Sequence, residues 1–398
     1  MQNDAVTKYT ISRLSQEASR MLLGCGIASL ALLAMMPSAA QGQAKPNTCE
    51  RKVDTIINNE MRNVGTPGFM VSIYQNSKPS LEKGYGRVSL PSGRVPDANT
   101  IFTIGSLSKA VTGVGALILY GQGKLDLEAP ISRYLPGVPQ SWSDIPVNKF
   151  LSHSSGIPRL DDIKETDFNA TLRAAANLPL AFTPGTKTAY NNFNFAVIGQ
   201  VIAAQSKQRY IDFMNRQIFT PLKMTSTGTV TKTTRSATGY DIDKQDNNPK
   251  PVNNSHWLAD GTDAFGIASG GLQSSAADLQ RLATALETKT LLPPKATLEL
   301  LKPVEVNKRG RKQPILYTSA GFIYTDASGT GVLHKTGGGS GVGTGAAMML
   351  VPDKNISVVL LRNLFAPGRA TSNGALAAAV IEACFGIKVP DAGDDGND

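Results

Sequence analysis

A chain of 398 residues with 41% hydrophobic, 18% charged and 6% aromatic residues is long enough to bury a large core, and this composition excludes both a disordered chain and a membrane protein. The formal net charge is +9, and the basic residues are scattered except in one run, Lys308-Arg309-Gly310-Arg311-Lys312. Without neighbouring aromatic residues, that run is typical of a solvated turn, so we expect no nucleic-acid partner. The net positive charge would favour the encounter with anionic substrates or an acidic cell-wall surface.

The first 40 residues have the pattern of an export signal. Arg13 and Arg20 precede an apolar run from Met21 to Met36, and Pro37-Ser38-Ala39-Ala40 supplies the small residues of a cleavage site. The run has about 16 residues, fewer than the roughly 20 that span a bilayer. The sequence therefore predicts a signal peptide over 1–40, cleavage near Ala40, a periplasmic or secreted mature protein and no stable membrane anchor.

The first helix is predicted over 48–63, and β-type runs follow over 68–74 and 81–88, separated by a hairpin-like break at 76–79. The middle of the chain reads as helices over 106–120, 147–152, 168–177, 193–205, 210–219 and 276–287. Strand signals return over 315–324, 332–335, 344–350 and 356–362, before a final helix over 371–385. This order predicts an α+β fold: an antiparallel sheet flanked by N- and C-terminal helices, with an inserted mainly helical domain.

The predicted domain boundaries follow from this order. The discontinuous sheet domain comprises 45–105 and 305–390, the helical domain 106–304, and 391–398 forms a flexible acidic tail. Between Met224 and Asp263 lies a Thr-, Asn- and Asp-rich stretch that is long for a loop inside a compact domain. We interpret it as a wall or lid of a functional site, the alternative being a surface excursion without a role.

After signal cleavage two cysteines remain, Cys49 and Cys384, one near each end of the mature chain. In an oxidising compartment they can form a disulfide, which requires the terminal helices to lie side by side, or they can stay separate buried thiols. Both alternatives are open from the sequence. Two cysteines without clustered histidines cannot form a zinc site, so we expect no metal and no cofactor.

A serine and a lysine form the first motif that points to chemistry, Ser106-Leu107-Ser108-Lys109. A serine hydroxyl needs a base to become a nucleophile, and Lys109 lies one helical turn beyond Ser106. Ser106 could instead be an ordinary N-cap. The helix N-terminus also favours a developing oxyanion, however, and a lysine whose pKa is lowered by desolvation can take the serine proton. We therefore predict Ser106 as nucleophile and Lys109 as its base.

Two further motifs follow along the chain. The first of them is Tyr190-Asn191-Asn192. The phenol of Tyr190, with an ordinary pKa of about 10, can act as a base only beside cations, which Lys109 and Lys335 would supply. Asn192 could also simply cap the following helix. Lys335-Thr336-Gly337 ends a strand and is followed by more glycines. Its backbone could pair with a substrate amide and its side chains could bind a carboxylate, the alternative being a glycine-rich turn.

Together, in this order, the three motifs resemble those of the serine β-lactamase and penicillin-binding-protein superfamily, and in particular its class C β-lactamase branch, which also holds DD-peptidase-like proteins and carboxylesterases. The resemblance covers roughly 54–385. Further blocks that resemble the family are 102–106, 123–127, 151–156, 183–186, 218–224 and 270–272.

Carried over onto this sequence, the resemblance implies that Ser106 is acylated, that Lys109 and Tyr190 handle protons and that Asn192 contacts a substrate amide. It also implies that Lys335 and Thr336 bind the substrate carboxylate and that Gly337 belongs to the same substrate-binding motif. The backbone N–H groups of Ser106 and Gly338 would form the oxyanion hole. Gly338 departs from the pattern, because class C enzymes commonly carry serine there.

The expected activity is that of an exported serine hydrolase that works through a covalent acyl-enzyme, with β-lactams as the favoured substrates. A carboxylesterase, a DD-carboxypeptidase or a non-enzymatic sensor acylated by penicillin are the alternatives, and we expect a monomer with a small-molecule substrate. The three histidines, His153, His256 and His334, are too scattered to form a motif. No Gly-x-Ser-x-Gly elbow is present, which argues against an ordinary Ser-His-Asp hydrolase.

Overall fold

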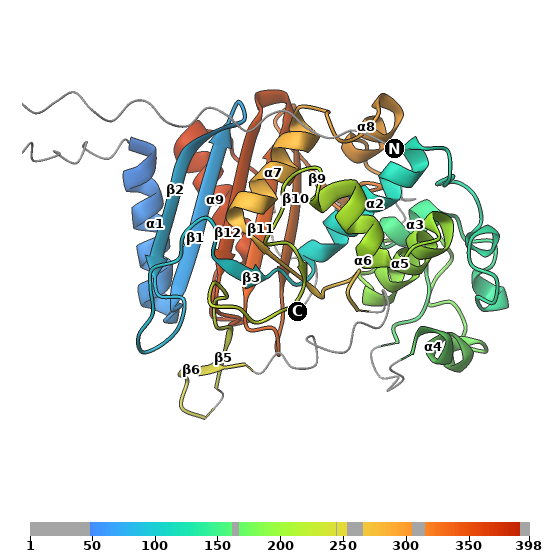
Figure 1. The fold of residues 1–398 in the computed structure, drawn as a ribbon, viewed down its shortest axis with the longest axis horizontal. Coiled ribbons are helices and arrows are strands. Elements are labelled where there is room, and N and C mark those ends of the chain that lie inside the picture. The colour runs from blue at the N-terminus through green and yellow to red at the C-terminus, as the bar shows by residue number, and fades with distance from the viewer. Residues whose placement is uncertain (1–47, 161–166, 244, 253–265, 305–314, 391–398) are drawn as a thin grey trace, which may run out of the picture. The chain divides into compact units, whose positions relative to one another are not determined.

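The computed structural model describes residues 48–160, 167–243, 245–252, 266–304 and 315–390, all within one compact unit (Figure 1). The predicted signal peptide, the basic run at 308–312 and the acidic tail lie outside the described residues. The fold is α+β, as predicted. The boundary between a sheet domain and a helical domain stays a prediction.

The core of the fold is an antiparallel sheet, seven-stranded within the described residues, in the order β2-β1-β12-β11-β10-β9-β8 (Figure 1). Its strands are β1 (Gly68–Gln75), β2 (Lys78–Gly86), β8 (Leu316–Tyr317), β9 (Ile323–Ala327), β10 (Thr330–Gly338), β11 (Gly345–Val351) and β12 (Ile356–Arg362). β1 pairs directly with β12, with Phe69 opposite Arg362. The two ends of the chain therefore share one sheet, as the order of elements predicts.

Both faces of this sheet are covered, which explains why its central strand, β11, is apolar throughout. Along β11, Ala347 and Met349 pack into a core with α1 (Thr48–Val64) and α9 (Asn373–Phe385). The alternate residues, Ala346 and Met348, pack into a second core with the remaining helices. Successive side chains of a strand point to opposite faces, so a strand buried on both faces shows no polar alternation.

The terminal helices α1 and α9 pack side by side, and a disulfide joins Cys49 to Cys384 across them, with Cα atoms 4.6 Å apart. Of the two alternatives left open by the sequence, the structure contains the bridge. Toward the other end of α1, the buried carboxylate of Glu60 connects this helix to β12 and to the segment that leads into α9. It accepts hydrogen bonds from Arg362 at 3.1 Å and from the Thr371 hydroxyl at 2.7 Å.

In the inserted region, helix α2 (Leu107–Gly121) packs against α5 (Asn192–Ser206) and α8 (Pro294–Leu301). The others are α3 (Val147–Leu151), α4 (Phe168–Ala175), α6 (Tyr210–Met214) and α7 (Ala276–Glu287). Short 3-10 turns occur at Ile131–Arg133, Gln140–Trp142 and Pro352–Lys354. Every residue of α2 from Leu107 to Leu119 is buried, so Ser108, Lys109 and Thr112 must find polar partners inside the protein.

The structure corrects several predicted elements. The helix predicted over 210–219 is α6 followed by a π-helical turn at Asn215–Phe219, and the strand predicted over 315–324 is two strands, β8 and β9, separated by a turn. A small antiparallel sheet that the sequence did not predict consists of β3 (Ile101–Thr103), β7 (Leu272–Ser275) and β4 (Gly228–Thr229). A hairpin of β5 (Tyr240–Ile242) and β6 (Pro249–Pro251) and helix α8 were also not predicted.

Candidate active site

Ser106 occupies the N-cap position of α2 but does not cap the helix. Its side chain makes no capping hydrogen bond. Instead, its Oγ lies 2.5 Å from Tyr190 Oη and 3.0 Å from Lys109 Nζ. Ser106 and Tyr190 are half-buried, so a small molecule can reach the hydroxyl. The capping alternative therefore does not describe this serine, and its hydroxyl is left to the two groups that could activate it.

Lys109 is completely buried, and its ammonium position is set by carbonyl oxygens. Nζ donates to Asn192 Oδ1 at 2.9 Å and to the main-chain oxygen of Ser269 at 2.6 Å. Neither oxygen can donate, so Lys109 must donate to both. Toward Ser106 Oγ, an ammonium can donate and a neutral amine can accept, and both fit the 3.0 Å separation.

Tyr190 lies between two buried lysines on the irregular segment that leads into α5. The Nζ of Lys109 is 4.8 Å and the Nζ of Lys335 is 5.4 Å from the centre of its ring. The N-cap of α5 is Asn191, whose side chain accepts the N–H of Phe193, so the neighbouring Asn192 is free of that task and contacts Lys109. Both lysines predicted to lie beside Tyr190 therefore do so.

Strand β10 brings the third motif against the nucleophile. A Cβ placed on Gly337 would come within 2.9 Å of the Ser106 nitrogen, and one on Gly105 within 2.5 Å of the Gly338 nitrogen. Gly105 also has a positive φ of 50°, a conformation that glycine adopts without strain. Only glycine at these positions lets the two backbones approach so closely.

This approach brings the backbone nitrogen of Gly338 close to the start of α2, where Ser106 lies. The Ser106 N–H is at the start of α2 and donates to no main-chain carbonyl of the described residues. Gly338 ends β10 opposite Gly345. The strand is held from behind, because Asn373 of α9 donates to the Gly337 carbonyl at 3.3 Å. The arrangement has the form of an oxyanion hole at a helix N-terminus.

Lys335 and Thr336 are buried on β10, and the Nζ of Lys335 also lies 5.4 Å from the centre of the Tyr317 ring. The residues predicted as a site come from the start of α2, the segment that leads into α5 and the end of β10. Contacts bring seven of them together: Ser106, Lys109, Tyr190, Asn192, Lys335, Gly337 and Gly338. Thr336 lies between Lys335 and Gly337 on β10, opposite Ala347. Their catalytic and binding roles remain predictions.

Two residues at this place were not predicted. Ser269 contributes only its carbonyl, and the nearby Gly270-Gly271-Leu272 block is the one sequence signal for it. His153 is completely buried, and its ring lies 4.6 Å from the Tyr190 ring. Burial and the charges of Lys335 and Lys109 lower the pKa of His153 well below 6.5, so its imidazole is neutral. His334, one residue before Lys335, is also buried and contacts Thr325.

No set of three His, Cys, Asp or Glu side chains is placed to hold a metal ion in the described part of the chain. Among the same residues, no helix has the length and apolar character of a membrane span.

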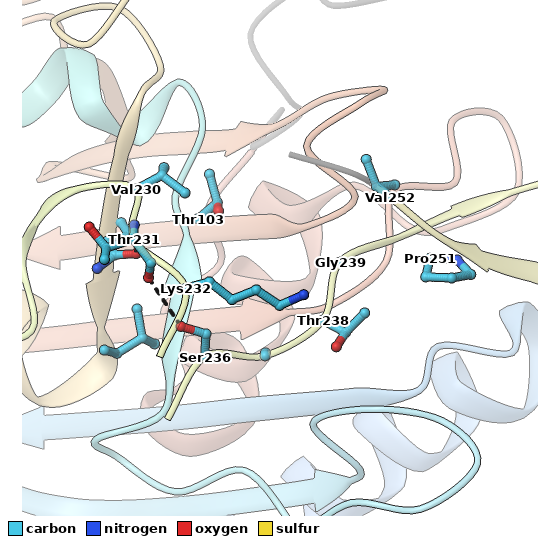
Figure 2. A pocket seen from close by; sticks show the side chains of 12 residues that line it. Thr103, Val230, Thr231, Lys232, Ser236, Thr238, Gly239, Pro251 and Val252 are labelled. Atoms are coloured by element: carbon cyan, nitrogen blue, oxygen red, sulfur yellow. Dashed lines mark hydrogen bonds between the residues drawn. The ribbon is translucent and has the colours of Figure 1, made fainter. Parts of the chain in front are cut away.

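A pocket of about 330 Å³ borders the small sheet. It is lined by Ile101, Thr103 and Gln273 of that sheet and by residues 230–232, 236–239 and 251–252. Figure 2 shows Lys232 extending across it toward Thr238. The described part of the stretch predicted as a wall or lid thus borders a pocket, but none of the residues predicted as a site lines it.

The chain is similar in sequence to known proteins over about half of its length. Over 211 residues the chain is 29% identical to Protein flp of Staphylococcus aureus (strain COL), a match that covers 49% of this chain and 42% of that protein. It is 27% identical over 190 residues to a β-lactamase of Yersinia enterocolitica, covering 46% of this chain and 49% of the relative. The chain thus matches less than half the length of these curated relatives.

Among solved structures, the octameric penicillin-binding protein homologue from Pyrococcus abyssi has the same fold. The TM-score is 0.71 at 21% sequence identity, over 85% of this chain and 78% of that one. The family model described as Beta-lactamase matches residues 53–382, which include all eight residues predicted as a site. This chain therefore belongs to the Beta-lactamase family.

Proposed function

We propose that this protein is a serine acyl hydrolase of the class C type that opens β-lactam rings through an acyl-enzyme at Ser106. The observation that carries the proposal is the environment of one hydroxyl. Ser106 Oγ is not used as a helix cap and contacts both Tyr190 Oη, at 2.5 Å, and Lys109 Nζ, at 3.0 Å. A serine with two proton acceptors and no structural task is the arrangement that nucleophilic catalysis requires.

In the proposed acylation step, Ser106 Oγ attacks the lactam carbonyl and its proton passes to Tyr190 or Lys109. The N–H groups of Ser106 and Gly338 receive the developing oxyanion. The C–N bond of the lactam then breaks, and the nitrogen takes the proton back. Water attacks the resulting ester with the same base, which releases the acid and restores the serine.

Lys335 and Thr336 supply the preference for an anionic substrate. A completely buried cation attracts a carboxylate more strongly than an exposed one, because the surrounding medium screens it less. β-Lactams carry a carboxylate near the scissile amide, whereas small neutral esters do not. Gly338 keeps the backbone donor of the oxyanion hole although it lacks the hydroxyl that class C enzymes commonly have.

The experiment is a parallel assay of the mature protein with nitrocefin, a short-chain p-nitrophenyl ester and a D-Ala-D-Ala peptide, with Ser106→Ala as the control. Nitrocefin turnover that disappears in S106A supports the proposal. Hydrolysis of the ester alone would assign a carboxylesterase, and release of D-Ala a carboxypeptidase. A stable penicillin adduct without turnover would assign the sensor. Each of these three outcomes removes the lactamase assignment.

We further propose that the protein is exported and cleaved near Ala40. The disulfide between Cys49 and Cys384 supports this, because such bridges persist in oxidising compartments. N-terminal sequencing of the protein from a periplasmic or culture fraction tests it: a start close to residue 41 is expected, and a start at Met1 would contradict it.

A further inference from the structure

The segment that carries Tyr190 has no regular secondary structure, yet His153 binds it on both sides of the tyrosine. The main-chain oxygen of His153 accepts the N–H of Ala189 at 2.8 Å. Its ring Nδ1 accepts the N–H of Asn191 at 3.2 Å and lies 3.3 Å from the side-chain nitrogen of Asn194. Ala189 and Asn191 are the two neighbours of Tyr190 in the chain. His153 therefore holds the main chain immediately before and immediately after Tyr190.

The imidazole ring also contacts the tyrosine directly. The two ring centres are 4.6 Å apart, with the ring planes inclined by 33°. The centre of the imidazole ring also lies 5.3 Å from the centre of the Phe195 ring and 4.9 Å from that of the Tyr317 ring. Contacts on several sides leave the imidazole little room to move, so the ring of Tyr190 rests against a fixed surface.

The backbone of His153 adopts a conformation that would suit another residue better. It follows the end of α3 with a φ of 54°, in the left-handed region where glycine or asparagine is favoured. A strained backbone conformation beside a functional site is a reason to look for a role of the side chain.

The protonation of His153 follows from its partners. Nδ1 accepts a backbone N–H, so the ring proton is on Nε2, which is buried without a hydrogen-bond partner among the described residues. The ionisable groups around the ring are Lys109 of α2, Lys335 of β10, Tyr190 and Tyr317. Burial, followed by the charges of Lys335 and Lys109, keeps the pKa of His153 well below 6.5. A protonated imidazole could not accept the N–H of Asn191.

We propose that His153 is a positioning residue that holds the Tyr190 hydroxyl against Ser106, chiefly through the bond from the Asn191 N–H to Nδ1. The inference rests on the proposed role of Ser106 as an acylated nucleophile. A displacement of about 1 Å can cost a hundredfold in rate, so the loss of this acceptor should slow acylation without removing any reacting group.

A matched pair of variants isolates the acceptor. In His153→Asn, Oδ1 occupies the place of Nδ1, and asparagine accepts a positive φ. In His153→Gln, the oxygen is one bond farther out, so the Asn191 N–H loses its partner. The control is His334→Gln, which removes another buried imidazole one residue from Lys335 that does not contact Tyr190.

The readout is the rate at which a fluorophosphonate probe labels Ser106, followed by intact mass between pH 6 and 10. In this reaction the Ser106 Oγ–P bond forms, the P–F bond breaks, fluoride leaves and the serine proton goes to Tyr190 or Lys109. The rate is independent of which acyl substrate the enzyme prefers. Circular dichroism and thermal melting confirm that each variant is folded.

We expect H153Q to be labelled about tenfold or more slowly, with its pH–rate profile moved to higher pH. H153N should stay within about fivefold of the wild type, and H334Q should match it. Equal rates and equal profiles for folded H153N and H153Q would overturn the inference, as would a wild-type rate in H153Q. If Ser106 of the wild type is not labelled at all, the proposed function fails, and the inference fails with it.

Discussion

Replacing Tyr190 by phenylalanine removes only the hydroxyl that lies 2.5 Å from Ser106 Oγ. The ring, its contact with His153 and its place between the two lysines are kept. A positioned general acid or base contributes about 10²- to 10⁴-fold to a rate, which corresponds to about 3 to 5 kcal/mol of activation free energy. We therefore expect kcat/KM to fall by that factor with whichever substrate the enzyme turns over.

The matched control is Tyr210→Phe. This tyrosine is also buried, and its hydroxyl bonds to Thr112 of α2 at 2.7 Å, but it does not touch Ser106. Its loss should lower stability by about 1 kcal/mol and leave kcat/KM within about threefold. The assay is steady-state hydrolysis of nitrocefin and of the p-nitrophenyl ester, with melting curves for both variants. A folded Y190F variant within threefold of the wild type would refute the assignment of Tyr190 as a proton-handling group.

Three other changes test separate parts of the structure. Burial raises the pKa of Glu287 from 4.5 to about 7, and neither carboxylate oxygen has a partner among the described residues. The contribution of Glu287 to stability should thus be fully present below pH 4.5 and be lost as the pH rises through 7. Glu287→Gln should remove this loss and gain about 3 kcal/mol at pH 8 in denaturant titrations, whereas an unchanged difference between the two proteins from pH 4.5 to 8 would contradict it. The double replacement of Cys49 and Cys384 by serine opens a link across 335 positions and should lower the unfolding free energy by about 3 to 5 kcal/mol, so an unchanged melting curve would argue against a bridge in solution. Lys335→Met should reduce kcat/KM for nitrocefin at least about tenfold more than for a neutral ester, because it removes a buried cation from the carboxylate site; equal losses would argue against that site.

Long elements with a clear pattern could be predicted from the sequence. Helix α7 begins and ends where its apolar spacing predicts, with Ser275 as a capping residue, and β12 matches its apolar run. The short strands β3 and β4 could not be predicted, since they contain too few residues for a periodicity to show and exist because they pair with β7. The run over 315–324 looks like one strand, but Gly321, with a φ of 72°, lies in the turn that divides it.

The candidate site was predictable where side chains carry the chemistry. Ser106, Lys109 and Tyr190 form motifs that can be read from residue type and order. Ser269 contributes only a carbonyl, and any residue has one. His153 was set aside because the three histidines are far apart in the sequence, and only the folded chain brings it to Tyr190. Contacts that depend on the backbone or on long sequence separations leave no motif.

Mapping the acyl group after brief exposure to a penicillin tests the central claim most directly. If Ser106 is the nucleophile, the wild-type protein gains the mass of one penicilloyl group, the modified peptide contains Ser106, and Ser106→Ala gains none and loses turnover. An adduct on another peptide, or a Ser106→Ala variant that still turns substrate over at the wild-type rate, would contradict it.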